Sequence, residues 1–193
     1  TPAAFRANYR FLAENFKAVV VGTTGWADIK DEVIAYFEKC GTPMIWASNF
    51  SIGVNIFFAV TDYISKMLGD AGGYSPYMVE MHHCHKLDAP SGTARELIES
   101  MGEAVGVDLV DDAVYGRPLG RHPREKGKVT FHAIRGGDTP SSHTVYFFGD
   151  GERLEITHHC LNWKGCAKGA VNACRWMVGK PVGLYGIRES MGL

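Results

Sequence analysis

The sequence has little that would suit a membrane, a secreted or a nucleic-acid-binding protein. No apolar run reaches the roughly 18 residues that a bilayer-spanning helix needs. The opening TPAAFR lacks the charged-then-apolar order of a signal peptide. Twenty Lys and Arg residues against 21 Asp and Glu residues give a formal charge of −1, with no long run of one sign. We therefore expect a cytosolic protein that acts on a small molecule and binds neither membrane nor nucleic acid.

The cysteines are too scattered in the sequence to indicate a disulfide framework or a structural zinc site. There are 5 of them, an odd number without a CxxC pair: Cys40, Cys84, Cys160, Cys166 and Cys174. Disulfide-rich folds and structural zinc sites use closely spaced pairs of cysteines. We therefore expect free thiols.

What is present is an alternation of helices and strands in the first part of the chain. Apolar residues three and four apart predict a helix over residues 2–16, and a β-branched run predicts a strand over 18–21 that is covered on both faces. A helix over 28–40, a strand over 43–47 and a helix over about 54–68 follow. This order predicts a parallel sheet with crossover helices. Ligands bind at the carboxyl edge of such a sheet, so the loops after the two strands are candidate nucleotide-binding loops.

The pattern changes near residues 68–74 to longer strand-like runs. Strands are expected over 77–80, 128–134, 143–148 and 153–159, and helices over 93–105 and 167–178. A Gly-Asp-Gly-Glu turn at residues 149–152 predicts a hairpin between the last two strands. The second part of the chain is therefore expected to be a mixed α+β unit.

The densest chemical segment is EMHHCHKLDAPSGTA at residues 80–94. Three histidines and one lysine fall within residues 82–86, and such a basic cluster is costly to hold together without an anion or a metal. The Ser-Gly-Thr at residues 91–93 then precedes a helical run, whose first turn offers free N–H groups and partial positive charge. Together these features predict a pocket for a carboxylate or a phosphate. The alternative is a surface loop followed by a capped helix.

Other polar segments are ordinary when taken singly. The Thr-His-His at residues 157–159 ends a strand and suits hydrogen-bonded structure as well as catalysis. The glycines at residues 22–25 suit a turn after a strand. The polar residues 48–53 suit a loop.

Taken together and in order, these segments resemble the conserved blocks of the dihydrodipicolinate reductase family. The matching segments are VVGTTG at 20–25, ASNFSIGVN at 47–55, HHCHKLDAPSGTA at 82–94, ERLEITH at 152–158 and GAV at 169–171. The resemblance spans essentially the whole chain, and its third block is highly specific. It implies reduction, with NADPH or NADH, of an unsaturated cyclic dicarboxylate formed from 4-hydroxy-tetrahydrodipicolinate. The product would be tetrahydrodipicolinate, in lysine and diaminopimelate biosynthesis.

The same resemblance implies roles for individual residues. His82 would be the proton donor and Lys86 a second catalytic cation. The implied substrate-binding residues are His83, Gly92 and Thr93. The implied cofactor-binding residues are Gly22, Thr23, Thr24, Ala47, Ser48, Asn49 and Phe50. A histidine acid suits neutral pH because its unperturbed pKa is about 6.5, and a bound dicarboxylate would raise that pKa where a neighbouring lysine lowers it.

The implied fold is α/β. It is the C-terminal part of a Rossmann-like parallel-sheet domain, followed by an α+β substrate-binding and tetramerisation domain with a mixed open sheet. Residues 1–50 would be the remainder of the dinucleotide-binding domain, and residues 51–180 the substrate-binding, catalytic and oligomerisation domain. Residues 181–193 would form a tail that returns to the first domain. The resemblance also implies a homotetramer, and self-association is expected because the strand segment 144–148 would otherwise leave an exposed apolar face.

Two features depart from the family pattern. Family members begin with a strand and a glycine-rich phosphate loop, which nothing before Phe5 supplies. The chain is therefore expected to be N-terminally incomplete, to bind NADH or NADPH barely or not at all, and to show little reductase activity. Residues 162–164 read Asn-Trp-Lys where the family usually has an arginine. Trp163 cannot grip a carboxylate, and Lys164 would offer a point charge in place of a planar fork.

Other functions stay open at this point. A catalytically impaired fragment, or a non-catalytic assembly module, would follow from loss of the nucleotide-binding half. A zinc-dependent hydrolase is the alternative from another class, with potential ligands His82, Cys84, His158, His159 and Cys160. Against zinc, the sequence has no HxxxH or HExxH pattern, and Lys86 would repel the ion.

Overall fold

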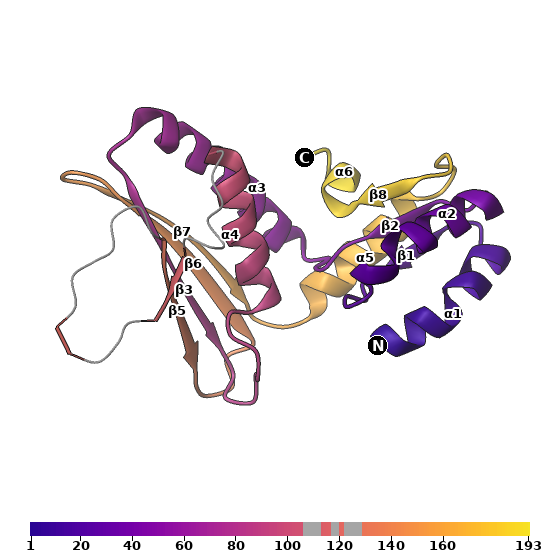
Figure 1. The fold of residues 1–193 in the computed structure, drawn as a ribbon, viewed down its shortest axis with the longest axis horizontal. Coiled ribbons are helices and arrows are strands. Elements are labelled where there is room, and N and C mark those ends of the chain that lie inside the picture. The colour runs from indigo at the N-terminus through magenta and orange to yellow at the C-terminus, as the bar shows by residue number, and fades with distance from the viewer. Residues whose placement is uncertain (106–112, 117–119, 122–128) are drawn as a thin grey trace. The chain divides into compact units, whose positions relative to one another are not determined.

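The chain folds into two compact units, each with its own sheet (Figure 1). The computed structural model describes residues 1–105, 113–116, 120–121 and 129–193. Thr1–Asn55 and Lys164–Leu193 form unit 1, and Ile56–Trp163 form unit 2. The chain passes from one unit to the other inside helix α3 (Ile52–Ala71) and returns after Trp163.

Unit 1 is a three-stranded parallel sheet with helices on both faces. Its elements are α1 (Pro2–Asn15), β1 (Val19–Val21), a short 3-10 helix η1 (Ala27–Ile29), α2 (Lys30–Cys40), β2 (Met44–Trp46), α5 (Lys164–Trp176), β8 (Leu184–Gly186) and α6 (Ile187–Met191). The strand order is β1-β2-β8, with both pairs parallel. This arrangement confirms the parallel sheet that the helix and strand alternation predicts.

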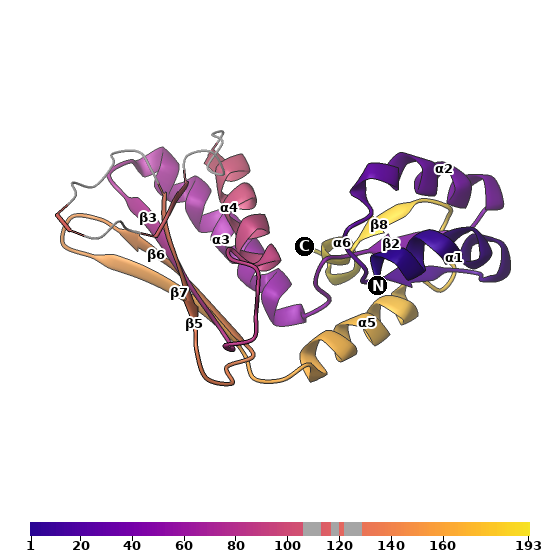
Figure 2. The ribbon, with the colours of Figure 1, turned by 60° about the horizontal axis from the view of Figure 1, so that its bottom comes forward.

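Alternation along β1 and β2 explains why helices cover both faces of this sheet. Val19, Val21 and Met44 pack in one hydrophobic cluster with residues of α1 and α2. Val20 and Ile45 pack in a second cluster with residues of α5 and α6. A strand buried on both faces needs apolar side chains at every position, as the sequence of β1 has. Figure 2 shows α5 and α2 on opposite sides of this sheet.

Unit 2 is a five-stranded mixed sheet with two helices along one face. Besides most of α3, it contains β3 (Ser75–His82), α4 (Gly92–Val105), β4 (Ala113–Tyr115), β5 (Val129–Arg135), β6 (Ser141–Phe148) and β7 (Arg153–Cys160). The strand order is β4-β5-β3-β6-β7. The pairs β3/β5 and β4/β5 are parallel, while β6 runs antiparallel to both β3 and β7. The predicted hairpin and mixed sheet are both confirmed.

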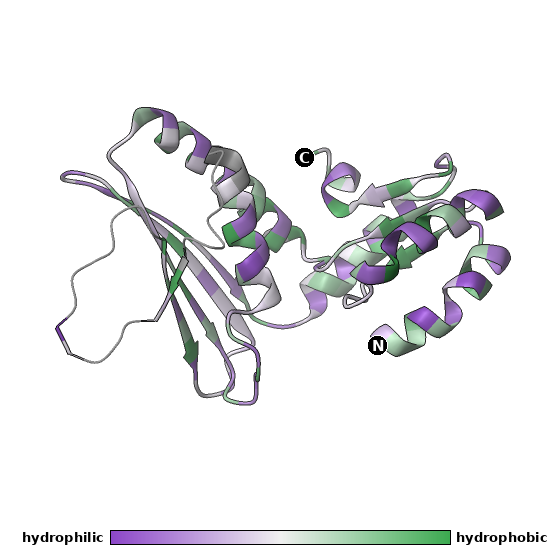
Figure 3. Cartoon of the chain, in the orientation of Figure 1, coloured by the Kyte–Doolittle hydropathy of each residue, from purple (hydrophilic) through white to green (hydrophobic). Residues whose placement is uncertain are grey.

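The two faces of this sheet differ in what they bury. The inner face carries Met78, Phe131 and Val145, all with 1% exposure or less, and α3 and α4 lie along it. On the outer face Tyr77 stacks on Tyr146, with ring centroids 4.4 Å apart. Figure 3 shows hydrophobic and hydrophilic residues mixed along both the helices and the strands.

Some boundaries differ from those expected from the sequence. Residues 164–180 were expected with the second domain, but α5 belongs to unit 1 because Ala173 is fully buried in the cluster beside β2. The chain end was expected to return to the first domain, and β8 does so by pairing with β2. The sequence did not predict β4, β8 or α6. Lys128, included in one expected strand, lies outside the described residues.

Two further expectations concern cysteines and membranes. All five cysteines are free thiols, as predicted. Within the described ranges, no helix combines the length and the apolar character that a membrane crossing requires.

Candidate active site

Strand β3 delivers two polar side chains to the inner face of the unit 2 sheet. Residues two apart on a strand point to the same side, and Glu80 and His82 are both buried, with 0% and 6% exposure. A carboxylate in this position is costly unless it is paired and hydrogen-bonded. Its surroundings therefore have to supply donors.

Three elements supply those donors to Glu80. The Ser91 N–H, just before α4, donates at 3.1 Å to Oε1 and lies 3.2 Å from Oε2. From β5, Arg135 donates through Nη2 to Oε1 at 2.6 Å. From β6, His143 Nε2 lies 3.4 Å from Oε2. Burial alone would raise the pKa of Glu80, but hydrogen bonds from His143, Ser91 and Arg135, together with the charge of His82 when it is protonated, bring that pKa down to about 2.

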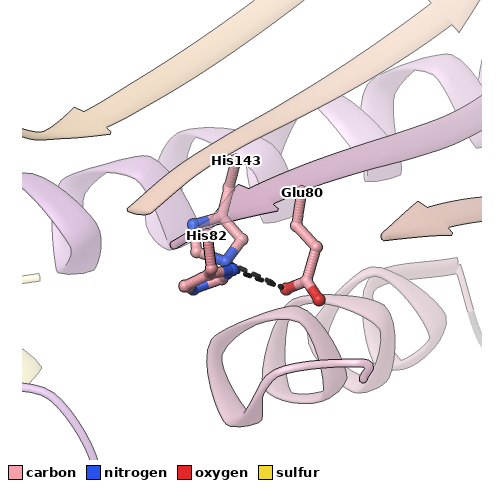
Figure 4. A group of neighbouring side chains, drawn as sticks. All are labelled: Glu80, His82 and His143. Carbon is pink, nitrogen blue, oxygen red and sulfur yellow. Dashed lines mark ion pairs between the residues drawn. The ribbon is translucent and has the colours of Figure 1, made fainter. Parts of the chain in front are cut away.

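His82 shares this carboxylate with His143. Its Nδ1 lies 3.7 Å from Glu80 Oε2, and the two imidazole rings meet edge-on with centroids 5.1 Å apart. Figure 4 shows both rings beside the Glu80 carboxylate. Burial lowers the pKa of His82 to about 4, since the opposing effect of Glu80 is outweighed by burial together with His143, Lys86 and Arg135. The imidazole is therefore neutral at pH 7 in the absence of a bound anion.

Sheet register accounts for this meeting of residues that are far apart in sequence. Glu80 is directly opposite His143 in the β3/β6 pair, and His82 is directly opposite Arg135 in the β3/β5 pair. Ser91 joins them from the helix side. Its hydroxyl accepts from the Ala94 N–H at 3.1 Å, as an N-cap does, and lies 3.2 Å from His143 Nε2.

Lys86 lies in the turn that follows β3. The Lys86 N–H donates to the His83 carbonyl at 3.1 Å, and its ammonium donates to Asp88 Oδ1 at 2.7 Å. That hydrogen bond lowers the pKa of Asp88. Arg135 also donates to the Asp88 carbonyl, at 2.6 Å. The turn is thus tied to the strands, and Lys86 has a partner that a substrate carboxylate would have to displace.

The residues expected to hold substrate lie at this same end of unit 2. His83 is half-buried in the turn after β3. Gly92 is exposed and Thr93 half-buried in the first turn of α4, whose early N–H groups have no partner within the helix. The structure therefore places His82, His83, Lys86, Gly92 and Thr93 around the end of β3 and the start of α4.

The expected cofactor-binding residues lie in two loops of unit 1, at the carboxyl edge of its sheet. In the first loop, which follows β1, the Thr23 carbonyl accepts from two indoles, Trp26 Nε1 at 2.6 Å and Trp46 Nε1 at 2.9 Å. Gly22 and Thr24 beside it are exposed. The indoles fix the backbone of this loop.

The second loop follows β2 and packs on the first. Ala47 continues the sheet by donating to the Val21 carbonyl at 3.1 Å, and Ser48 is exposed. Asn49 Oδ1 accepts from the Ser51 N–H at 2.8 Å. Phe50 is buried, and its ring packs against Gly22. A Cβ built on Gly22 would lie 3.4 Å from the Phe50 ring.

The structure does not gather the set of zinc ligands considered from the sequence. In the described parts of the chain, three or more candidate ligands come together in only one group, Glu80, His82 and His143, with ligand atoms within 4.8 Å. The guanidinium of Arg135 already lies 2.6 Å from that carboxylate, so a metal ion would meet a neighbouring cation. The group is better described as one carboxylate between two imidazoles.

Three residues of this cluster were not identified as functional from the sequence. They are Glu80, Arg135 and His143. Only Glu80 could have been identified from the local sequence, because residues two apart on a strand point to the same face and Glu80 precedes His82 by two residues. Trp163, where an arginine was expected, is 69% exposed.

Comparisons with known proteins cover both units. A family described as the N-terminus of dihydrodipicolinate reductase matches residues 1–50, and one described as its C-terminus matches residues 53–191. The 4-hydroxy-tetrahydrodipicolinate reductase of Ralstonia pickettii (strain 12J) is 46% identical over 177 residues, covering 91% of this chain and 65% of that protein. The protein of the same name from Acinetobacter baumannii (strain AYE) is 38% identical over 193 residues, covering 100% and 70%.

A solved structure has the same fold. It is a dipicolinate-bound dihydrodipicolinate reductase from Paenisporosarcina sp. TG-14, with a TM-score of 0.75, 21% identity, and coverage of 99% of this chain and 71% of that one. The two family matches together take in both units of the structure and leave very few residues out. On these grounds the chain belongs to the dihydrodipicolinate reductase family.

Proposed function

We propose that this chain carries out the reductase step of lysine and diaminopimelate biosynthesis. The substrate is the cyclic dicarboxylate formed from 4-hydroxy-tetrahydrodipicolinate, and the product is tetrahydrodipicolinate. Relatives between 38% and 46% identical are named for this activity. The observation that carries the proposal is the buried, neutral His82 beside Lys86, at the end of a strand and next to a helix start.

His82 is the proton donor in this proposal. Its low pKa keeps the ring neutral in the free protein, and a dicarboxylate arriving beside it favours the charged form. The group therefore becomes an acid only when substrate is present. Lys86 supplies a second positive charge once the substrate displaces Asp88 from its ammonium.

The first turn of α4 and His83 hold the substrate carboxylates. Gly92 has no neighbouring atoms where a side chain would be, so a ligand can approach the backbone closely. The N–H groups at the start of the helix, which have no partner within it, and the partial positive charge of a 14-residue helix favour an anion there. Thr93 adds a hydroxyl. Trp163 contributes no charge, so these groups and Lys86 have to bind the substrate carboxylates.

The nicotinamide cofactor, NADPH or NADH, supplies a hydride when bound. The residues that fit its nicotinamide side are Gly22, Thr23 and Thr24 of the first loop and Ala47, Ser48, Asn49 and Phe50 of the second. These loops follow parallel strands at the carboxyl edge, where dinucleotides bind in this class of fold. In this scheme residues 1–50 and the returning tail serve the dinucleotide, and unit 2 serves the substrate.

The chain acts as a homotetramer in the cytosol in this proposal. Support for self-association comes from the outer face of the unit 2 sheet, on the side away from α3 and α4. Its exposed apolar side chains include Met81, Ile134 and Phe148, with 37%, 44% and 48% exposure. Exposed apolar side chains on one sheet face commonly mark a protein interface.

The test is a reductase assay with freshly generated 4-hydroxy-tetrahydrodipicolinate, following oxidation of NADPH and of NADH separately. His82→Gln and Lys86→Ala should each lower kcat by about 100-fold or more, since a positioned acid is worth about 10²–10⁴-fold. His85→Gln, in the same turn but exposed, is the matched control and should keep wild-type turnover. Dipicolinate should inhibit competitively. Near-normal rates for both variants would remove these residues from the mechanism, and a wild-type protein that stays inactive at saturating NADPH and NADH would contradict the function.

A further inference from the structure

His82, the proposed proton donor, faces the carboxylate of Glu80, and the proposed reaction gives that carboxylate no role. Glu80 is fully buried, lies between two imidazoles, and is too deep to touch a substrate. A glutamate whose only duty was to fill the core would be replaced at less cost by an apolar side chain. Its arrangement therefore calls for a function.

The contacts give the three groups a definite order. Glu80 Oε1 accepts from Arg135 and Ser91, so that oxygen is occupied by fixed donors. Oε2 is the oxygen that faces both rings, at 3.4 Å from His143 Nε2 and 3.7 Å from His82 Nδ1. The 3.7 Å separation is too long for a hydrogen bond, so Glu80 acts on His82 through its charge.

That charge acts unequally on the two nitrogens of His82. Nδ1 is the nitrogen within 4 Å of the carboxylate, and it has no hydrogen-bond partner of its own. A nearby anion favours a proton on the nearer nitrogen. The other ring nitrogen, Nε2, is then the one that can give up a proton and remain bare afterwards.

We propose that Glu80 is a positioning residue for the proton donor, an inference that rests on the proposed function of this site. Its carboxylate supplies the counter-charge for protonated His82 and keeps a proton on Nδ1, so that Nε2 delivers the transferred proton to the substrate. In the step, the Nε2–H bond of the imidazolium breaks, the substrate gains that proton, and neutral His82 keeps its Nδ1–H. Glu80 stays ionised throughout and exchanges no proton.

The charges around the cluster support this assignment. The groups that act on His82 are Glu80, His143, Lys86 and Arg135, and Glu80 is the only anion among them. Arg135 balances Glu80 while His82 is neutral, and protonation of His82 leaves one excess positive charge for a dicarboxylate to meet. On β7, His158 lies opposite His143, and its pKa is itself lowered by burial, with smaller effects of His143 and His159. His158 is therefore neutral at pH 7 and adds no charge to the cluster.

Nitrogen-15 NMR of the histidine side chains tests the tautomer without any need for enzymatic activity. In the wild-type protein, neutral His82, assigned by its loss in His82→Gln, should carry its proton on Nδ1. In Glu80→Gln the neutral ring should shift toward the Nε2–H tautomer, because the amide removes the charge but keeps the size of the side chain. A wild-type ring already protonated on Nε2 would overturn the proposal, even if Glu80→Gln failed to fold.

The pH dependence of kcat tests the counter-charge. In Glu80→Gln the alkaline limb should move to lower pH by about 1 pH unit or more, because an opposite charge within about 4–6 Å shifts a pKa by about 1–3. Glu80→Asp keeps the charge and should bring the limb back toward its wild-type position. Glu99→Gln, the same change at an exposed site on α4, should leave the limb in place.

A merely structural role for Glu80 gives a different result. Turnover would then fall by a similar factor at every pH, with the limb and the tautomer unchanged, and the proposal would be wrong. If the wild-type protein instead proved inactive as a reductase while the Nδ1–H tautomer depended on Glu80, the proposed function would fail, and of the present inference only the control of the His82 tautomer by Glu80 would stand.

Discussion

At the residue scale, the candidate site contains charges that neutralise one another in pairs. Buried Glu80 pairs with Arg135, and Lys86 pairs with the exposed Asp88. Removing Arg135 would leave the buried charge of Glu80 uncompensated, which costs far more than the pair contributes. His82 is the group left neutral. In the proposed mechanism, the proton donor is therefore uncharged until an anion arrives.

This arrangement predicts acid sensitivity. In the folded protein the pKa of His82 is about 4, below its ordinary value of 6.5. The unfolded chain binds more protons between these values, so the free energy of unfolding decreases as pH falls from about 6.5 to about 4, by about 2–3 kcal/mol at most. Glu80, with its pKa lowered to about 2, adds a further decrease below its ordinary 4.5.

Urea unfolding at a series of pH values checks this prediction. The wild-type protein should lose more stability between about pH 7 and pH 4 than His82→Gln, whose side chain cannot be protonated in this range. The comparison is between slopes, so a uniform offset between the two proteins does not matter. Parallel curves for wild type and variant would show that His82 is not held neutral by the fold.

At the element scale, local sequence patterns predicted most helices and strands but not the contacts that assemble them. The β-branched run of β1 and the spacing of apolar residues in α1 were sufficient for their assignment. Strand β8 has only three residues and becomes a strand by pairing with β2 from a distant part of the chain. Likewise, Arg135 and His143 reach Glu80 through sheet register, which no local pattern encodes.

The assignment of α5 to unit 1 depends on one close approach. A Cβ on Gly169 would lie 1.7 Å from the carbonyl oxygen of Phe50, a distance that no real contact allows. The helix therefore packs directly on the backbone of the second loop. Periodicity in the sequence reveals a helix here, but it does not reveal which unit the helix packs against.

Gly169→Ala should consequently destabilise unit 1 by about 1–3 kcal/mol or more, because α5 or the Phe50 loop must shift to make room. Thermal unfolding measures the loss, and cofactor titration should show weaker binding through the displaced loop. Gly165→Ala in the same helix is the matched control, since its Cβ would lie 3.6 Å from Ser51 Oγ, an ordinary contact. Equal stability of the two variants would mean that α5 does not pack as described.

At the scale of the whole molecule, the proposed roles separate between the two units. The loops proposed for the cofactor lie in unit 1, and His82, Lys86 and the first turn of α4, which are proposed for the substrate, lie in unit 2. Unit 2 also has an outer sheet face, on the side away from the described helices α3 and α4 and from the candidate site (Figure 1). On that outer face, Val79 lies opposite Thr144 on one side and His132 on the other, next to the stacked tyrosines.

If this outer face joins copies of the chain, a charge at its centre should separate them. Light scattering at micromolar concentration should give about four times the chain mass of 21.2 kDa for the wild-type protein. Val79→Lys should give a mass closer to that of one chain, because a buried ammonium without a partner is costly at an interface but harmless in water. Ala35→Lys, exposed on α2 in unit 1, adds the same charge and should not change the mass. Circular dichroism confirms that both variants are folded. A monomeric wild-type protein would contradict the tetramer, and an unchanged mass for Val79→Lys would place the interface on another surface.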